Sequence, residues 1–233
     1  MIRPLRAIFL GPPGAGKGTL TGRLCRDFPP LITISSGDVL RQHISDRTAI
    51  GVQAESCMRQ GKLVPDKVMI DLITSEMKSH GLLSPSASWI LDGFPRTEIQ
   101  APALEEALAV AHANINLVVV LDVPESVILD RIENRWIHEP SGRVYNLTFN
   151  PPKVPGRDDV TGEPLVKRLD DNVETFQKRL ASYRETTLGL IDYFNTRGLV
   201  QRFSGTSSDE IYPKLLSYVK HEYGTQHQPL ADA

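Results

Sequence analysis

Short apolar segments alternate with helical patterns along most of the chain. Strand-like runs occupy residues 7–10, 31–34, 89–91 and 117–121, and residues 199–203 supply a fifth. Strands that alternate with helices in this way form a parallel sheet covered by helices on both faces. We therefore predict an α/β fold with a five-stranded parallel sheet, whose strand carboxyl ends share one edge, where ligands bind.

Two further features of the pattern concern the second half of the chain. The longest predicted helix follows Asp170 and Asp171 and stops at Gly198. Its apolar stripe recurs at spacings of three and four at Phe176, Leu180, Tyr183, Thr187, Leu190 and Phe194. Between Trp136 and Arg168 the pattern collapses into Pro, Gly and polar residues. This segment is too long for a plain loop in a compact domain and is predicted to be a lid.

Composition narrows the classes of protein. The 233 residues are 40% hydrophobic and 23% charged, which suits one main domain with insertions. A net charge of −2 argues against a general nucleic-acid or membrane-surface binder, and no apolar run reaches the roughly 20 residues of a membrane span. Cys25 and Cys57 are too few for a disulfide framework or a four-cysteine zinc site. Arg3 and Arg6 fit either an organelle-targeting start or an ordinary basic N-terminus.

A phosphate-binding loop follows the first predicted strand and opens a helix. It reads Gly11-Pro12-Pro13-Gly14-Ala15-Gly16-Lys17-Gly18-Thr19. Glycines let the backbone wrap round phosphate oxygens, the helix N-terminus faces the anion, and Lys17 supplies a full charge. Gly18 stands where a Ser or Thr usually holds magnesium, which disfavours a GTPase-like switch.

A second motif stands at the end of the third strand, Trp89-Ile90-Leu91-Asp92-Gly93-Phe94-Pro95-Arg96. Its acid emerges at the phosphate edge of the sheet, where Asp92 is placed to anchor magnesium through the water shell of the ion. The run from Asp92 to Arg96 is highly specific for nucleoside monophosphate kinases. Together with Gly18-Thr19 it makes the chain resemble the adenylate kinase family over about residues 7–218.

The resemblance implies an acceptor site for AMP. In this family the insertion that contains residues 35–64 is a flap that binds the monophosphate, Arg96 holds its α-phosphate, and the amide of Gln100 reads the base. Without the resemblance, Ser36 would be a helix cap and Arg41 a solvated residue. The residues implied to bind AMP are Ser36, Arg41, Lys62, Leu63, Val64, Gly93, Phe94, Pro95, Arg96, Gln100, Arg168 and Arg179.

The resemblance also implies a donor site and a clamp of arginines. Arg131 and Arg135 are four apart on one predicted helix, so both could reach a single anion. The residues implied to bind the triphosphate are Gly14, Ala15, Gly16, Lys17, Gly18, Thr19, Arg131, Arg135, Val144, Tyr145 and Ser207. Planar guanidinium groups suit phosphoryl transfer, which depends on positioning and on neutralising charge. The implied catalytic residues are Lys17, Arg96, Arg135, Arg168, Arg179 and Asp92.

Four polar residues in the predicted lid have the spacing of a zinc ribbon without its cysteines. They are His138, Ser141, Asp158 and Thr161. Lids of this family come in two kinds, and these residues resemble the kind in which hydrogen bonds replace the metal. The alternative is four unrelated polar loop residues. We therefore expect no structural zinc, and Mg²⁺ that enters with the triphosphate.

The expected organisation has three parts and a tail. Residues 1–34, 65–134 and 172–222 form the core P-loop domain, residues 35–64 the flap, residues 135–171 the lid, and residues 223–233 a disordered tail.

The expected activity is reversible phosphoryl transfer from a nucleoside triphosphate to AMP. The long lid, with Trp136 and Asn146, resembles the mitochondrial matrix branch of the family, which uses GTP with AMP. GTP as donor and the mitochondrial matrix follow from that resemblance, and ATP and the cytoplasm are the alternatives. A UMP/CMP kinase would carry a much shorter lid, and a non-catalytic nucleotide-binding module would not need the flap and the arginines. A monomer is expected, because flap and lid must open and close.

Overall fold

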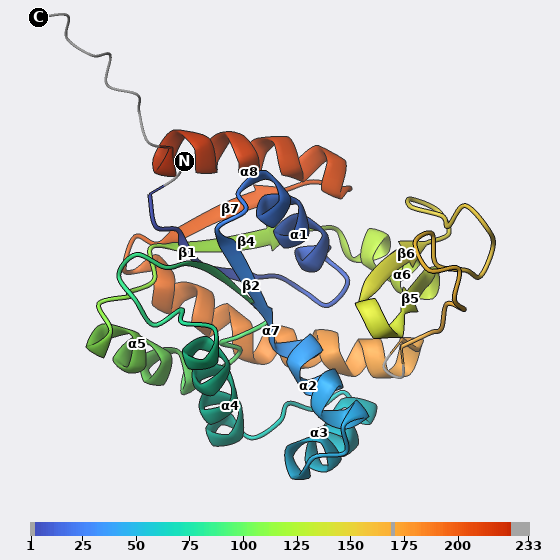
Figure 1. The fold of residues 1–233 in the computed structure, drawn as a ribbon, viewed down its shortest axis with the longest axis horizontal. Coiled ribbons are helices and arrows are strands. Elements are labelled where there is room, and N and C mark those ends of the chain that lie inside the picture. Colours follow the sequence, from blue (N-terminus) through green and yellow to red (C-terminus); the bar gives the residue numbers. More distant parts are fainter. Residues whose placement is uncertain (1–2, 169–170, 225–233) are drawn as a thin grey trace, which may run out of the picture.

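The computed structural model of the protein describes residues 3–168 and 171–224. Its centre is a five-stranded sheet in the order β2-β3-β1-β4-β7, and every neighbouring pair is parallel (Figure 1). The strands are β1 (Arg6–Leu10), β2 (Leu31–Ser35), β3 (Ser88–Asp92), β4 (Leu117–Asp122) and β7 (Val200–Ser204). The predicted α/β fold is confirmed, and the predicted strand bounds are within one residue of these.

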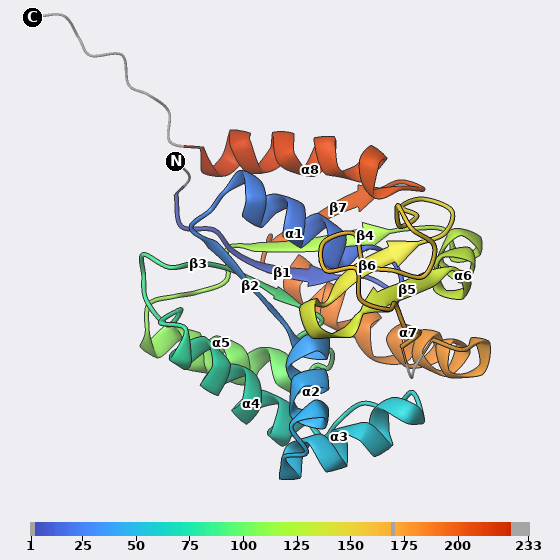
Figure 2. The same ribbon diagram turned by 45° about the vertical axis from the view of Figure 1, so that its right-hand side comes forward.

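Helices cover both faces of the sheet because both faces are apolar. In β1, Ala7 and Phe9 pack in one cluster with α1 and α8, whereas Ile8 and Leu10 pack on the opposite side with α4, α5 and α7. Successive strand residues point to opposite faces, so a continuous apolar run contacts both helical layers. Figure 2 shows α1 and α8 on one side of the sheet and α4, α5 and α7 on the other. The helices of these layers are α1 (Lys17–Asp27), α4 (Asp66–Ser79), α5 (Gln100–Val110), α7 (Val173–Asn195) and α8 (Ser208–Tyr223).

Helix α7 is the long helix that the sequence predicts. Its first turn is capped by the Asn172 side chain, which accepts a hydrogen bond from the Thr175 amide at 2.8 Å. Tyr183 is half-buried, and the rest of the predicted stripe is buried at Phe176, Leu180, Thr187, Leu190 and Phe194. Asp170, expected just before this helix, lies outside the described residues. The stripe lets α7 pack on the sheet and, further towards its N-terminus, on α6 (Glu125–Glu133).

Two inserted segments project from the core. Helices α2 (Ser36–Ser45) and α3 (Ala49–Arg59) pack on each other and project beside the sheet (Figure 2). The predicted lid contains an antiparallel pair, β5 (Arg135–His138) and β6 (Arg143–Asn146), joined by the short 3-10 helix η1 (Glu139–Ser141). Each strand has only four residues, too few for a periodicity to stand out in the sequence.

The C-terminal boundary differs slightly from the predicted one. Helix α8 includes Tyr223, whose side chain is buried against the core, so the predicted tail begins one residue inside this helix. Residues 225–233 of that tail lie outside the described part of the chain. None of the described helices combines the length and apolar character needed to cross a membrane.

Candidate active site

The loop between β1 and α1 is built to hold an anion. Gly14 and Gly16 have positive φ angles of 82° and 93°, and α1 begins directly afterwards at Lys17. The Lys17 Nζ donates to the carbonyl oxygens of Gly11 at 2.8 Å and Pro12 at 3.1 Å, so its ammonium group folds back over the loop. This places a positive charge beside the N-terminus of a helix, as phosphate binding requires.

The Lys17 ammonium group lies among several other charged groups. Burial lowers its pKa to about 8; the Asp92 carboxylate acts in the opposite direction, and Arg96, Arg179 and Arg135 lower it further. These three arginines come from separate parts of the chain, and the fold brings them within electrostatic reach of one lysine. A bound phosphate would relieve their mutual repulsion.

Helix α6 fixes the position of the loop. A Cβ atom at Gly14 would lie 2.8 Å from Cγ2 of Ile128, so glycine is needed for close packing as well as for its positive φ. Arg131, one turn further along α6, donates to the carbonyls of Gly14 at 3.3 Å and Ala15 at 3.1 Å and to Thr206 at 2.8 Å. Arg131 therefore joins the phosphate loop to the loop after β7. Gly18 and Thr19 are exposed at the start of α1.

Asp92 stands at the end of β3 and faces this loop. A Cβ atom at Gly18 would lie 3.8 Å from its Oδ2, which places the carboxylate beside the first turn of α1. Burial raises the pKa of Asp92, while Lys17 and Arg96 act in the opposite direction. Among residues 3–168 and 171–224, no group of three or more His, Cys, Asp and Glu could hold a metal ion. A single buried carboxylate beside a phosphate site fits Mg²⁺, which keeps several waters and is held largely by substrate phosphates.

Most residues predicted to bind AMP gather at one cavity, the predicted acceptor cavity, between the sheet edge, the predicted flap and α7. At its base the Ser36 hydroxyl donates to the Gly93 carbonyl at 2.7 Å, and Arg96 Nε donates to the same oxygen at 2.6 Å. Gly93 has a φ of 74°, and a Cβ there would lie 2.9 Å from an Arg96 guanidinium nitrogen and 3.0 Å from Ser36 Oγ. The predicted site residues that line the cavity are Lys17, Ser36, Arg41, Lys62, Leu63, Val64, Gly93, Phe94, Pro95, Arg96, Gln100 and Arg179.

The remaining predicted arginines lie at the lid side of the site. The prediction that Arg131 and Arg135 share one helix is wrong, because α6 ends at Glu133 and Arg135 is the first residue of β5. Arg135 is paired with the buried Asp171, to which its Nε donates at 2.7 Å. Burial, followed by the charges of Arg41 and Arg135, lowers the pKa of Arg168 to about 10, and its buried Nε has no hydrogen-bond partner. Arg168 does not line the cavity. Arg41 forms an ion pair with Asp38 on its own helix. The arginines thus converge on the acceptor cavity and its lid-side rim.

The predicted donor-base contacts are dispersed in this structure. Val144 is exposed, whereas Tyr145 is buried within the lid, where its hydroxyl donates to Asp158 at 2.9 Å. Ser207 caps α8 by accepting the Glu210 amide at 3.1 Å. The Tyr145 hydroxyl, which the resemblance places against the donor nucleotide, is bonded within the lid to Asp158 and to the Asp159 amide.

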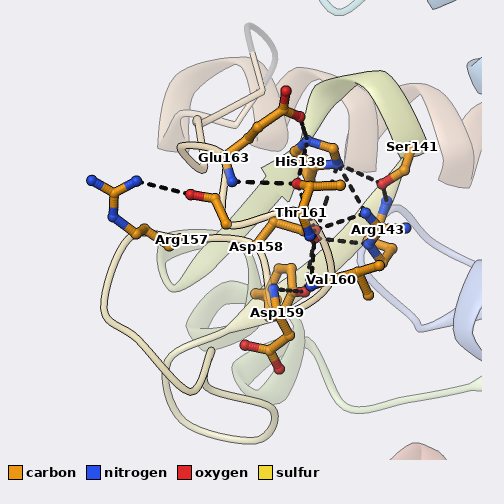
Figure 3. A network of polar contacts seen from close by, with 11 residues as sticks. His138, Ser141, Arg143, Arg157, Asp158, Asp159, Val160, Thr161 and Glu163 are labelled. Atoms are coloured by element: carbon orange, nitrogen blue, oxygen red, sulfur yellow. Dashed lines mark hydrogen bonds and ion pairs between the residues drawn. The ribbon is translucent and has the colours of Figure 1, made fainter.

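The four polar residues of the lid are in mutual contact (Figure 3). His138 Nδ1 lies 2.7 Å from Ser141 Oγ, and the Thr161 hydroxyl donates to Asp158 Oδ2 at 2.9 Å and lies 3.4 Å from His138 Nε2. The Arg143 guanidinium donates two hydrogen bonds of 2.7 Å to the Asp158 carboxylate. These bonds hold the pKa of this carboxyl well below its usual range. The four residues with zinc-ribbon spacing thus belong to one connected network of hydrogen bonds.

Several residues of the lid network and of the cavity were not among the residues predicted from the sequence. Glu163 binds His138 Nε2 at 2.6 Å, and Arg143 completes the bonding of Asp158. On the acceptor side, Tyr183 and Thr187 line the cavity from α7, where the sequence indicated only a core stripe. The spacing of the zinc-ribbon pattern could not signal Glu163, which lies outside that pattern. A polar residue within an apolar helical stripe, such as Thr187, is a signal that could have been used.

The amino-acid sequence is similar to those of known proteins. The sequence model of the family described as Adenylate kinase matches residues 9–199. The chain belongs to the adenylate kinase family. Among its relatives, a protein of Saccharomyces cerevisiae named "GTP:AMP phosphotransferase, mitochondrial" is 54% identical over 96% of each chain. A Drosophila melanogaster protein of the same name is 46% identical over 90% of this chain and 93% of its own, and an "Adenylate kinase" of Malassezia globosa is 40% identical over 88% and 79%.

Proposed function

We propose that this protein catalyses the reversible, Mg²⁺-dependent transfer of the terminal phosphoryl group from a nucleoside triphosphate, preferably GTP, to AMP, giving GDP and ADP. The observation that carries the proposal is that Lys17, Arg96 and Arg179 line one cavity at the carboxyl edge of the sheet, with Arg135 close enough to lower the pKa of Lys17. A cluster of positive side chains attracts polyanions, and the two substrates together supply four phosphate groups. Membership of the adenylate kinase family supports the same reaction.

The chain contributes position and charge to this reaction. An oxygen of the AMP phosphate attacks the terminal phosphorus, and the bond to the bridging oxygen of the donor breaks. In our proposal Lys17 and the phosphate loop hold the donor, Arg96 holds the acceptor phosphate, and Arg135, Arg168 and Arg179 neutralise charge on the migrating group. No covalent intermediate and no side-chain general base are required.

Magnesium would be held by the donor phosphates and water, with Asp92 anchoring that water shell. Bound there, Mg²⁺ neutralises phosphate charge and orients the terminal group for in-line attack. We propose that no zinc is needed, because the polar side chains of the lid satisfy one another.

We further propose that the flap (35–64) and the lid (135–171) move relative to the core (1–34, 65–134 and 172–222). Water competes with AMP for the phosphoryl group, so the flap and the lid should both close when both substrates are bound. A monomer suits this movement, because a contact between subunits on the flap or the lid would restrict it.

The choice of GTP and of the mitochondrial matrix is supported by the names of the Saccharomyces and Drosophila relatives, which read "GTP:AMP phosphotransferase, mitochondrial". ATP is the alternative donor.

The decisive experiment measures initial rates of ADP formation from AMP with Mg²⁺ and saturating GTP, ATP, ITP or CTP. We expect GTP to give the highest rate, and we expect Arg96→Ala to lose about a thousandfold in turnover. A higher rate with ATP would refute the GTP preference and leave the reaction class standing. Failure of all four donors to phosphorylate AMP would refute the proposed function.

A further inference from the structure

A chain of hydrogen bonds connects the acceptor cavity to the first residue of α4. The Arg96 amide donates to Gln100 Oε1 at 2.7 Å, and Gln100 Nε2 donates to Asp66 Oδ1 at 2.7 Å. The Thr97 hydroxyl also donates to Asp66 Oδ1, at 3.0 Å. Gln100 is 2% exposed and lines the cavity, whereas Asp66 is half-buried behind it.

These partners permit only one orientation of the Gln100 amide. The backbone N–H of Arg96 can only donate, and an ionised Asp66 carboxylate can only accept. Turning the amide over would set its NH₂ group against the Arg96 N–H and its oxygen against the carboxylate. Two favourable contacts would become two repulsive ones in a buried place, where unsatisfied polar groups are costly.

The fixed amide has a defined capacity left for a ligand. A glutamine amide offers two lone pairs and two N–H groups, and one of each is already used. One acceptor and one donor remain, in a fixed order. Adenine places its N6 amino donor beside a ring-nitrogen acceptor, which matches this pair. Hypoxanthine has an oxygen in place of the amino group, so its oxygen would face the amide oxygen of Gln100.

We propose that Asp66 is a specificity-determining residue for the acceptor base: by fixing the orientation of the Gln100 amide, it makes the cavity accept adenine and reject 6-oxopurines. Asp66 acts through Gln100 and is therefore a positioning residue. The assignment rests on the proposed function, because it takes AMP as the acceptor that occupies this cavity.

A purely structural role for Asp66 makes a different prediction. An acidic residue in the first turn of a helix stabilises that helix, and Asp66 is the first residue of α4. If this were its whole role, its loss would weaken the reactions with AMP and with inosine monophosphate by the same factor. Selectivity between the two acceptors therefore separates the roles.

The test compares kcat/KM for AMP and for inosine monophosphate, with one donor at saturation, in the full-length enzyme. In Asp66→Ala we expect the preference for AMP to fall about tenfold or more through KM, with kcat for AMP nearly unchanged. Asp66→Asn keeps nearly the same side-chain volume but can donate as well as accept, so it no longer dictates the orientation of the Gln100 amide and should lose the preference much as Asp66→Ala does. Asp71→Ala removes an exposed acid from the same helix and should leave the preference at its wild-type value. If Asp66→Ala does not fold, Asp66→Ser, whose side chain ends short of Gln100, replaces it.

An unchanged preference in Asp66→Ala, or equal losses with both acceptors, would overturn the assignment and leave the proposed function intact. A wild-type enzyme that forms no ADP from AMP would overturn the proposed function, and the assignment with it.

Discussion

Substitution of Gly93 tests whether the close packing at the base of the acceptor cavity controls catalysis. In Gly93→Ala the new Cβ meets an Arg96 guanidinium nitrogen at 2.9 Å and Ser36 Oγ at 3.0 Å. Backbone strain is the smaller part of the effect, because an alanine at a φ of 74° costs about 1–2 kcal/mol. The larger part is displacement of the guanidinium tip, which is flexible and moves away from its place beside the phosphate site.

The two effects can be separated with a matched control. Gly81 has a φ of 66°, and nothing lies within 4 Å of a Cβ added there, so Gly81→Ala carries the strain without the displacement. Both variants should lose about 1–2 kcal/mol of unfolding free energy in urea titrations. Only Gly93→Ala should also lose about a hundredfold in kcat/KM for AMP, since a misplacement of about 1 Å at a reacting centre costs that much. Equal activity of the two variants would refute the reasoning.

Two further predictions concern the phosphate loop and the lid. Because the pKa of Lys17 is lowered to about 8, kcat/KM for the donor should fall as the pH rises above about 8, and Lys17→Met should abolish this fall. In the unfolded chain the same lysine keeps its proton up to a pH of about 10.5. The free energy of unfolding of the free enzyme should therefore rise between pH 8 and about pH 10.5, because the unfolded state binds the extra proton there. Denaturant titrations at several pH values can check this. In the lid, Tyr145→Phe should cost about 1 kcal/mol, since the hydroxyl donates to Asp158 and accepts the Asp159 amide at 2.8 Å; a calorimetric melting temperature equal to that of the wild type would contradict this.

Much of the candidate site could be predicted from the sequence because its motifs are contiguous. The phosphate loop, and the run from Asp92 to Arg96, each place glycines and charged residues on one short turn. The strand before each turn fixes where it points, so composition and order alone indicate the chemistry. The same holds for the stripe of α7, where local spacing determines which side chains are buried.

Contacts between distant segments could not be predicted in this way. His138 pairs with Glu163, and Gln100 bonds to Asp66, although the spacing of these residues in the sequence carries no periodic signal. The burial of Tyr145 likewise depends on its surroundings in the fold. Which hydrogen-bond partner a side chain takes depends on packing around it, and a resemblance names residues without giving their neighbours.

By itself, the sequence determined the α/β architecture, the phosphate loop and the set of arginines, since these follow from local periodicity and short motifs. Only the tertiary structure decided the strand order, the convergence of Arg96, Arg135 and Arg179 on Lys17, and the orientation of the Gln100 amide. The physical reason is that hydrogen bonds and charge interactions act over a few ångströms in space. Chain folding alone sets which residues come within that range.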